Sequence, residues 1–158
     1  MKTQNSFGSY VTQLETTLNE YFAVKAPALP PGAKEAIVKF GPWITLIFLI
    51  LAIPGLLVIP GLLVIFSAGA VLSTASMMGG YGYGPLFYIS IIFLIIALVL
   101  EALAISPLMK RQKKGWNLMF YATLVNAVHN LVSFNIIGLI IGLLIGFYIL
   151  FQVREYYK

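Results

Sequence analysis

The chain has no cysteine and no aspartate among its 158 residues. Without cysteine, the protein has no disulfide, no thiolate nucleophile and no cysteine-ligated metal. Charge is also scarce, since 9% of the residues are charged against 60% that are hydrophobic, and the mean hydropathy is +0.94. A soluble globule of this length needs far more polar surface. The composition therefore predicts a protein that folds in a lipid bilayer.

The missing residue types also argue against an enzyme. The sequence has no paired intramembrane carboxylates, no histidine close to an acid and no phosphate-binding glycine loop after a strand. Its one histidine, His129, cannot by itself make a zinc site, which takes at least three protein ligands. We therefore expect no catalytic residue, no metal site and no cofactor.

The ten basic residues lie almost entirely in short segments beside apolar runs. In such positions they orient a membrane protein and contact anionic lipid headgroups, so nucleic acid is not an expected partner. The candidate contacts for anionic lipid are Lys110, Arg111, Lys113 and Lys114.

Four apolar runs dominate residues 40–158, and a helix needs about 20 such residues to cross a bilayer. Basic segments precede the first run, separate the second from the third, and follow the last, whereas the other two connections carry no charge. By the positive-inside rule, the chain crosses a cell membrane four times with both termini cytoplasmic. The predicted fold is an all-α, polytopic membrane protein with spans at about 41–64, 86–106, 116–132 and 136–153.

Residues 1–25 precede the membrane domain and lack the basic start and apolar core of a signal peptide. Residues 7–22 are predicted to form an amphipathic helix. Its charges are Glu15 and Glu20, which anionic lipid would repel, so docking on protein is favoured over lying on lipid. That protein is either the chain's own cytoplasmic loops or the same helix of a neighbouring subunit. The predicted association seam is Phe7, Val11, Leu14, Leu18 and Tyr21.

Residues 26–39 are predicted to be a proline-rich linker, stiffest at 26–33, where no helix can continue. Further on, AIPGLLVIPGLLVI sets Pro54 and Pro60 into an apolar run. We interpret these prolines as kinks that bend the first span around its neighbours. The alternative is a broken helix that lines a substrate site. Residues 67–85 are placed in or at the outer interface.

The last span carries glycine at every fourth position, a spacing that lets a second helix approach closely. Glycine is disfavoured inside a helix relative to alanine, so three at this spacing need a reason. The partner helix is either in the same chain or in another copy of a homo-oligomer. The predicted packing residues are Gly138, Gly142 and Gly146.

Polar side chains inside the spans are the candidate functional residues. Glu101 is the only acid in any span, and Tyr121 lies at a comparable depth in the next span. We interpret Glu101 as one half of an interhelical hydrogen bond, with a proton-coupled or cation-binding role as the alternative. Asn126, His129 and Asn130 share one helix edge, which either faces the bundle interior or lines a small aqueous vestibule.

The segments KEAIVKFGPWITLIF, KRQKKGWNLMFY and IIGFYILFQVREYYK resemble a group of small four-span bacterial membrane proteins to which no activity is assigned. The resemblance covers residues 34–158, and its most specific part is the basic loop that runs into Gly-Trp-Asn. It implies a bacterial cytoplasmic membrane and four helices, but no site residue.

Two functions fit the sequence. The favoured one is a self-associating membrane protein with a structural or assembly role. The alternative is a small channel or transporter subunit whose polar path is lined by the kinked first span, Glu101 and the Asn126/His129/Asn130 edge. The alternative is disfavoured because these residues are expected at opposite membrane depths with little polar connection between them.

Overall fold

The structure is a computed structural model that describes residues 7–73 and 85–158, with the side chains at 7, 53, 55–88 and 90 left undescribed. Helices make up the ordered elements of these residues, and the described ranges contain no strand. The predicted all-α class is therefore confirmed for this part of the chain. Most of the predicted interfacial segment 67–85 lies outside the described residues.

The first helix, α1 (Phe7–Asn19), is followed by a π-helical turn, η1 (Glu20–Lys25). Residues 27–30 have no regular structure, and α2 (Pro31–Ser73) begins immediately after them. The predicted linker 26–39 is therefore wrong over its second half. A proline is well tolerated in the first turn of a helix, where its fixed φ suits the helix and its missing N–H has no partner to lose.

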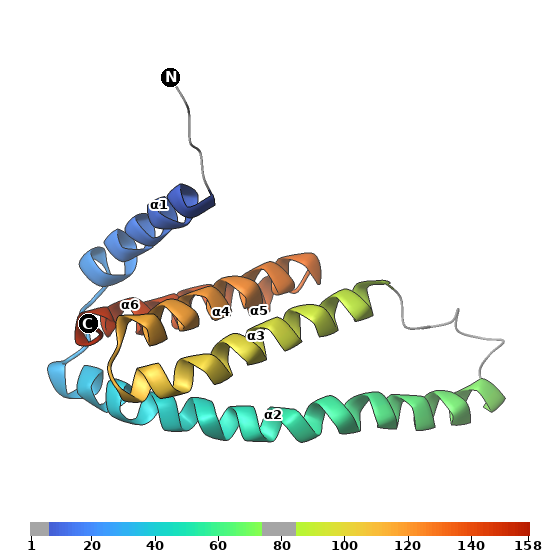
Figure 1. The fold of residues 1–158 in the computed structure, drawn as a ribbon. Coiled ribbons are helices and arrows are strands. Elements are labelled where there is room, and N and C mark those ends of the chain that lie inside the picture. The colour runs from blue at the N-terminus through green and yellow to red at the C-terminus, as the bar shows by residue number, and fades with distance from the viewer. Residues whose placement is uncertain (1–6, 74–84) are drawn as a thin grey trace.

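Helix α2 contains 43 residues, so it is about 65 Å long. The helical backbone is unbroken through Pro54 and Pro60, and Figure 1 shows one gently curved helix. The broken-helix alternative is therefore wrong. The predicted span 41–64 forms only the middle of an element about twice as long as a bilayer core is thick.

The remaining apolar runs form helices close to their predicted bounds. They are α3 (Pro85–Met109), α4 (Lys113–Val132) and a continuous helical segment made of α5 (Ile136–Ile141), the π-helical turn η2 (Gly142–Phe147) and α6 (Tyr148–Gln152). A short 3₁₀ turn, η3 (Arg154–Tyr156), ends the fold.

Two tight turns connect these helices, and both place a non-glycine residue in the left-handed region. Arg111 has φ 53° and Phe134 has φ 54°. At the first turn Gln112 N–H donates to the Pro107 carbonyl and Arg111 N–H to the Leu108 carbonyl. This is the pair of bonds of a Schellman motif, whose left-handed position usually carries glycine. The second turn repeats the pattern between Asn130 and Asn135.

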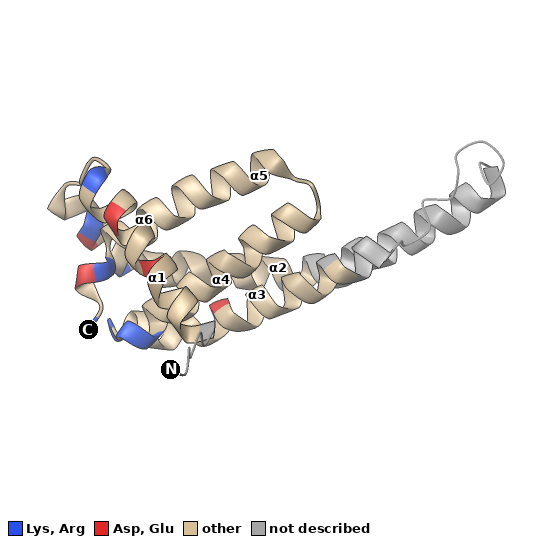
Figure 2. Cartoon of the chain, turned by 90° about the horizontal axis from the view of Figure 1, so that it is seen from above, with Lys and Arg blue, Asp and Glu red and all other residues tan. Residues whose placement is uncertain are grey.

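The helices α2, α3, α4 and α5 run side by side, and α1 crosses above one end of them (Figure 1). Figure 2 shows the Lys and Arg residues of the described chain and all but one of the Glu residues gathered at this end, where the C-terminus also lies; the exception is Glu101 on α3. We call it the charged end. The opposite end of the α4–α5 hairpin, formed by residues 133–135, is called the turn end.

Among the described residues, two helical segments are long and apolar enough to cross a membrane, Pro31–Ala52 and Ile91–Met109. Only 11% and 17% of their apolar windows are buried. A core helix of a soluble protein hides such side chains, whereas these present them outward. The apolar segment Ile136–Gln152 is slightly shorter than the other two.

An aromatic cluster forms the core of the charged end. The Trp116 side chain is fully buried, and its indole N–H donates to the Leu150 carbonyl at 2.8 Å. The Phe120 ring stacks on it with centroids 5.5 Å apart, and the Phe151 ring meets its edge at 5.3 Å. Phe147 is buried beside them. These contacts fix the start of α4 against the end of the chain.

Gly115 lies one residue before Trp116, at the closest approach of α3 and α4. A Cβ at Gly115 would lie 2.6 Å from the Leu108 backbone nitrogen and 2.9 Å from the Pro107 carbonyl carbon. Backbone atoms cannot move aside as a flexible side chain can. Gly115 is therefore the glycine that close helix packing requires, although the four-residue glycine spacing pointed elsewhere.

We expect Gly115→Ala to destabilise the protein by about 1–3 kcal/mol, the usual cost of overfilling a packed site. Thermal unfolding in detergent, followed by circular dichroism, measures the effect. The matched control is Gly41→Ala, because a Cβ there would meet nothing within 4 Å. Equal stability of the two variants would show that α3 and α4 are not in close contact at Gly115.

Candidate functional site

The Glu101 carboxyl of α3 lies close enough to the Asn126 side chain of α4 to interact with it electrostatically. Tyr121, the partner expected from its depth, instead exposes 41% of its surface. Both members of the new pair are half-buried. The only acid of the predicted spans thus has an amide partner on the neighbouring helix.

The direction of helical side chains explains why depth alone selected the wrong partner. In an α-helix each Cα–Cβ bond tilts toward the N-terminus of its own helix. Because α3 and α4 are antiparallel, the Glu101 side chain leans toward the turn end and the Asn126 side chain leans back toward the charged end. The two groups therefore meet although their backbone positions are about one turn or more apart.

A chain of hydrogen bonds continues from Asn126 to the turn end. Asn130 Nδ2 donates to the Asn126 carbonyl at 2.9 Å, and Asn135 Nδ2 donates to Asn130 Oδ1 at 3.0 Å. Asn135 Oδ1 then accepts from the Gly138 backbone N–H at 3.0 Å and so caps α5. We call Glu101, Asn126, Asn130 and Asn135 the polar series.

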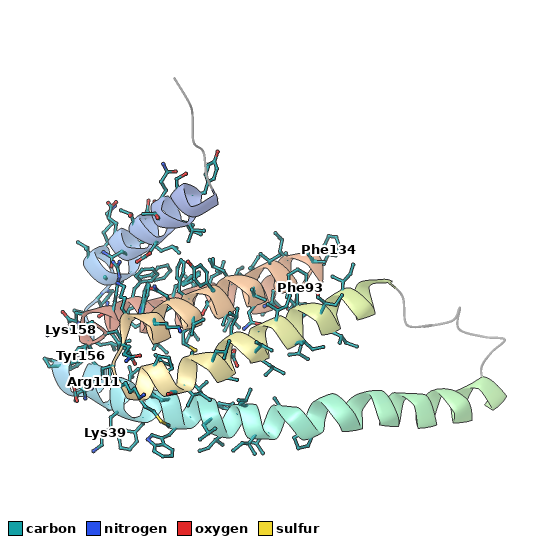
Figure 3. The ribbon with its side chains drawn as sticks, in the orientation of Figure 1. Lys39, Phe93, Arg111, Phe134, Tyr156 and Lys158 are labelled. Carbon is teal, nitrogen blue, oxygen red and sulfur yellow. The ribbon has the colours of Figure 1, made fainter. Side chains whose placement is uncertain are left out.

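The polar series ends beside the turn that carries Phe134. Figure 3 shows Phe134 and Phe93 together at this end of the helices, far from Arg111 and Lys158 at the charged end. The Phe93 ring contacts the His129 imidazole, with centroids 6.1 Å apart. His129 therefore borders the polar series and packs against an aromatic side chain of α3. In the described residues no three metal-ligating side chains gather.

The three glycines of the last helix have different surroundings. The Cβ position of Gly138 is filled by the Asn135 and Asn130 side chains, and that of Gly146 lies 3.3 Å from the Thr123 methyl group. A Cβ on Gly142 would meet nothing within 4 Å among the described residues. Within the described part of the chain, therefore, no helix approaches Gly142 closely, whereas α4 approaches Gly138 and Gly146. The π-helical turn that starts at Gly142 changes the rotation per residue, so the spacing of four no longer defines one face.

The N-terminal helix packs on the end of its own chain. Val11 and Leu18 of the predicted seam contact the aromatic core, as does Phe22. Leu14 and Tyr21 point away and are 41% and 56% exposed, and the Phe7 side chain lies outside the described residues. The seam is thus split: Val11 and Leu18, which are seven residues apart, dock together with Phe22, whereas Leu14 and Tyr21 lie outside the docked face.

Ion pairs tie the charged end together. Three of them join segments that are far apart in the sequence, and the fourth is local. They are Lys34–Glu155 at 2.9 Å, Arg111–Glu35, Arg154–Glu15 and Lys25–Glu20 at 2.7 Å. Every glutamate of the chain except Glu101 is therefore paired with a base.

Ionisable groups at the charged end are perturbed by burial and by these pairs. Burial, followed by the nearby Arg154 charge, lowers the pKa of Lys113. The hydrogen bond that Lys25 donates to Glu20 raises the pKa of Lys25, and burial raises the pKa of Tyr157. Lys113 is thus a cation held in an environment that disfavours its charge.

Sequence reasoning missed Gln152, a buried polar residue that holds the segment before α2. Its side chain is 2% exposed. Gln152 Oε1 accepts from the Leu29 N–H at 3.0 Å, and Nε2 donates to the Phe22 carbonyl at 2.8 Å. The Tyr148 hydroxyl donates to the Pro27 carbonyl at 2.7 Å. No sequence signal marks Gln152, since it lies in a helix end that reads as apolar.

No protein family model, no curated protein and no solved structure matches this chain.

A double-mutant cycle tests the Glu101–Asn126 pair. We expect Glu101→Leu and Asn126→Leu to show a coupling free energy of about 0.6 kcal/mol, and at most about 1.7 kcal/mol, the range of interhelical hydrogen bonds in membranes. Unfolding of the two single variants and the double variant in detergent gives this value. The control cycle replaces Asn126→Leu by Tyr121→Phe and should give coupling near zero. Coupling to Tyr121 but not to Asn126 would contradict the pairing.

Proposed function

We propose that the chain is a four-span integral membrane protein with both termini in the cytoplasm, and that it self-associates in a structural or assembly role. Membrane insertion is supported by the two long apolar helices, whose side chains face outward. Four spans are supported by the side-by-side arrangement of α2, α3, α4 and the α5–α6 segment, in which α3 and α4 run antiparallel. A cytoplasmic location of the charged end follows from the positive-inside rule, because its basic segments lie together.

Self-association rests on Gly142. A glycine at this position makes the helix less stable than an alanine would. No described atom of the same chain lies within 4 Å of the position where a Cβ would be. The neighbouring helix surface is apolar and open, since Ile141 and Ile145 are 52% and 56% exposed. A helix of a second copy can approach closely at such a position, where close packing supplies much of the association energy in lipid.

Single-cysteine labelling of this cysteine-free chain tests the topology. We expect Phe134→Cys at the turn end to react with a membrane-impermeant thiol reagent from outside the cell. Gln112→Cys at the charged end should react only after permeabilisation. The two positions are both exposed, so they form a matched pair. Labelling of position 112, but not 134, in intact cells would overturn the proposed orientation.

Native mass spectrometry of Gly142→Leu tests the association. We expect the variant to shift a defined oligomer to monomer while thermal unfolding of the monomer stays within about 1 kcal/mol of the parent, because a Cβ at Gly142 meets no described atom within 4 Å. Leu144→Ile, a conservative change at a position that is also exposed, is the control and should keep the oligomer. An unchanged oligomer in Gly142→Leu would remove this face from the interface.

A channel or transporter subunit is the second candidate, and the polar series favours it. The objection from sequence was that Glu101 and the Asn126/His129/Asn130 edge lacked a polar connection. Such a connection is supported by the proximity of Glu101 to Asn126 and by the hydrogen bonds from Asn130 to the Asn126 carbonyl and from Asn135 to Asn130. Ion flux across proteoliposomes that is abolished by Glu101→Gln would favour this candidate over the structural role.

A further inference from the structure

A polar cavity of about 430 Å³ opens at the charged end, where four distant parts of the chain meet. Its walls come from the N-terminal segment, the first turn of α2, the first turn of α4 and the C-terminal turn. The lining residues that matter here are Asn19, Lys34, Lys113, Arg154 and Glu155.

Three cations thus line one cavity. Lys34 is well buried, with 17% of its side chain exposed, and it pairs with Glu155, which is 66% exposed at the rim. Arg154 pairs with Glu15. Among the described residues Lys113 makes no ion pair. Counting side chains alone, these three cations and their two carboxylate partners leave one positive charge, and the carboxyl group of Lys158 lies beside it, where it accepts from the Lys113 backbone N–H at 2.7 Å.

Lys113 and Arg154 are also held close to each other. The Lys113 ammonium lies 5.0 Å from the centre of the Trp116 ring, and the Arg154 guanidinium carbon lies 5.1 Å from the same centre. Cation–π attraction offsets part of their mutual repulsion. Helix α4 begins at Lys113, so the positive end of its dipole adds to the same wall.

One of the three guanidinium nitrogens of Arg154 has no hydrogen-bond partner among the described residues. Its two terminal nitrogens are bonded, Nη1 to Asn19 Oδ1 at 3.0 Å and Nη2 to Glu15. Its Nε is buried and has no hydrogen-bond partner. Buried donors are nearly always paired, and a bond from a charged donor is the strong kind. The cavity is instead marked by its cations, since Lys113 has no ion pair among the described residues and Lys34 and Arg154 line the same space, which suits an anionic acceptor with several oxygens.

We propose that this cavity binds a phosphate-type oxyanion, held by Lys113, Lys34 and the Arg154 guanidinium, and that its binding fastens the N-terminal helix to the rest of the fold. The oxygens of a phosphate group can accept bonds from all three cations at once, and bonds from charged donors to phosphate are short and strong. The anion is the headgroup phosphate of a lipid or a free phosphate. Of the four basic residues first assigned to lipid contact, only Lys113 lines the cavity.

The N-terminal segment contributes Asn19 and, through Glu15, the partner of Arg154. A ligand that bridges Arg154, Lys113 and Lys34 therefore stabilises the docked state of α1, since it binds where all of these segments are together. Binding of the anion should therefore give a saturable change in the fluorescence of the buried Trp116, and it should protect α1 from proteolysis.

Trp116 fluorescence reports on the cavity, because two cations that line the cavity, Lys113 and Arg154, lie over the Trp116 ring. Trp43 is the only other tryptophan, and it is 56% exposed. The full-length Trp43→Phe protein is titrated with inorganic phosphate at constant ionic strength set by chloride. A parallel titration uses dodecylmaltoside micelles containing phosphatidylglycerol, with phosphatidylcholine micelles as the neutral match.

We expect a saturable change that Lys113→Gln weakens about tenfold, the effect of losing one charge-assisted bond, and that Lys110→Gln leaves unchanged. Lys110 is an exposed lysine of the same loop that does not line the cavity. A response to phosphate identifies a free anion as the ligand, and a response to phosphatidylglycerol alone identifies a lipid headgroup. No saturable response, or equal weakening by both substitutions, overturns the proposal. Arg154→Lys keeps the charge and should bind weakly while α1 remains docked.

Discussion

The buried indole of Trp116 is the interaction on which the rest of the charged end depends. Its N–H bond to the Leu150 carbonyl and its stacking on Phe120 join the start of α4 to the last helix. A buried tryptophan removes 150–250 Å² of surface from solvent, more than most side chains. This contact also sets the approach of α3, because Gly115 must face Leu108 closely for Trp116 to reach its site. Arg154 lies over the same ring and carries the bonds to α1.

The polar series shows how an apolar bundle accommodates a carboxyl group. An unpaired acid among apolar side chains is costly, and a hydrogen-bonded one much less so. The Asn126 side chain lies beside the Glu101 carboxyl group. Asn130 donates to the Asn126 carbonyl, Asn135 donates to Asn130, and Asn135 caps α5. Because Asn135 and Asn130 fill the space over Gly138, that glycine serves the polar series and not a helix crossing. The same residues fit a structural role or one wall of a path, which is why both functions stay open to test.

The ends of the helices were predictable from sequence where apolar length and local breakers agree, as at 86–106, 116–132 and 136–153. Sequence reasoning failed where tertiary context decides. Prolines at 30 and 31 suggested a linker, yet Pro31 starts α2 because a first-turn proline loses no bond. Depth matching chose Tyr121 for Glu101 because it ignored the tilt of helical side chains.

The glycine spacing assumed a regular helix, and the π-helical turn at Gly142 altered the face. No repeat of glycines in the sequence marks Gly115, and its importance is seen only in its contact with the Leu108 backbone.

The N-terminal segment is part of the core of the charged end and not an appendage to it. Surface ion pairs such as Lys25–Glu20 contribute little, because water and salt screen them. The bonds to Gln152 weigh more, since that amide is 2% exposed and a lost partner would leave buried polar groups unsatisfied. Phe22, which packs on Phe147, adds apolar burial to the same attachment. The attachments of α1 and of the chain before α2 therefore converge on residues 147–154. A ligand that binds Arg154 therefore acts on α1, α4 and the C-terminal turn together. Arg154 belongs to that turn, bonds Asn19 and Glu15 of the N-terminal segment, and lies over the Trp116 ring of α4.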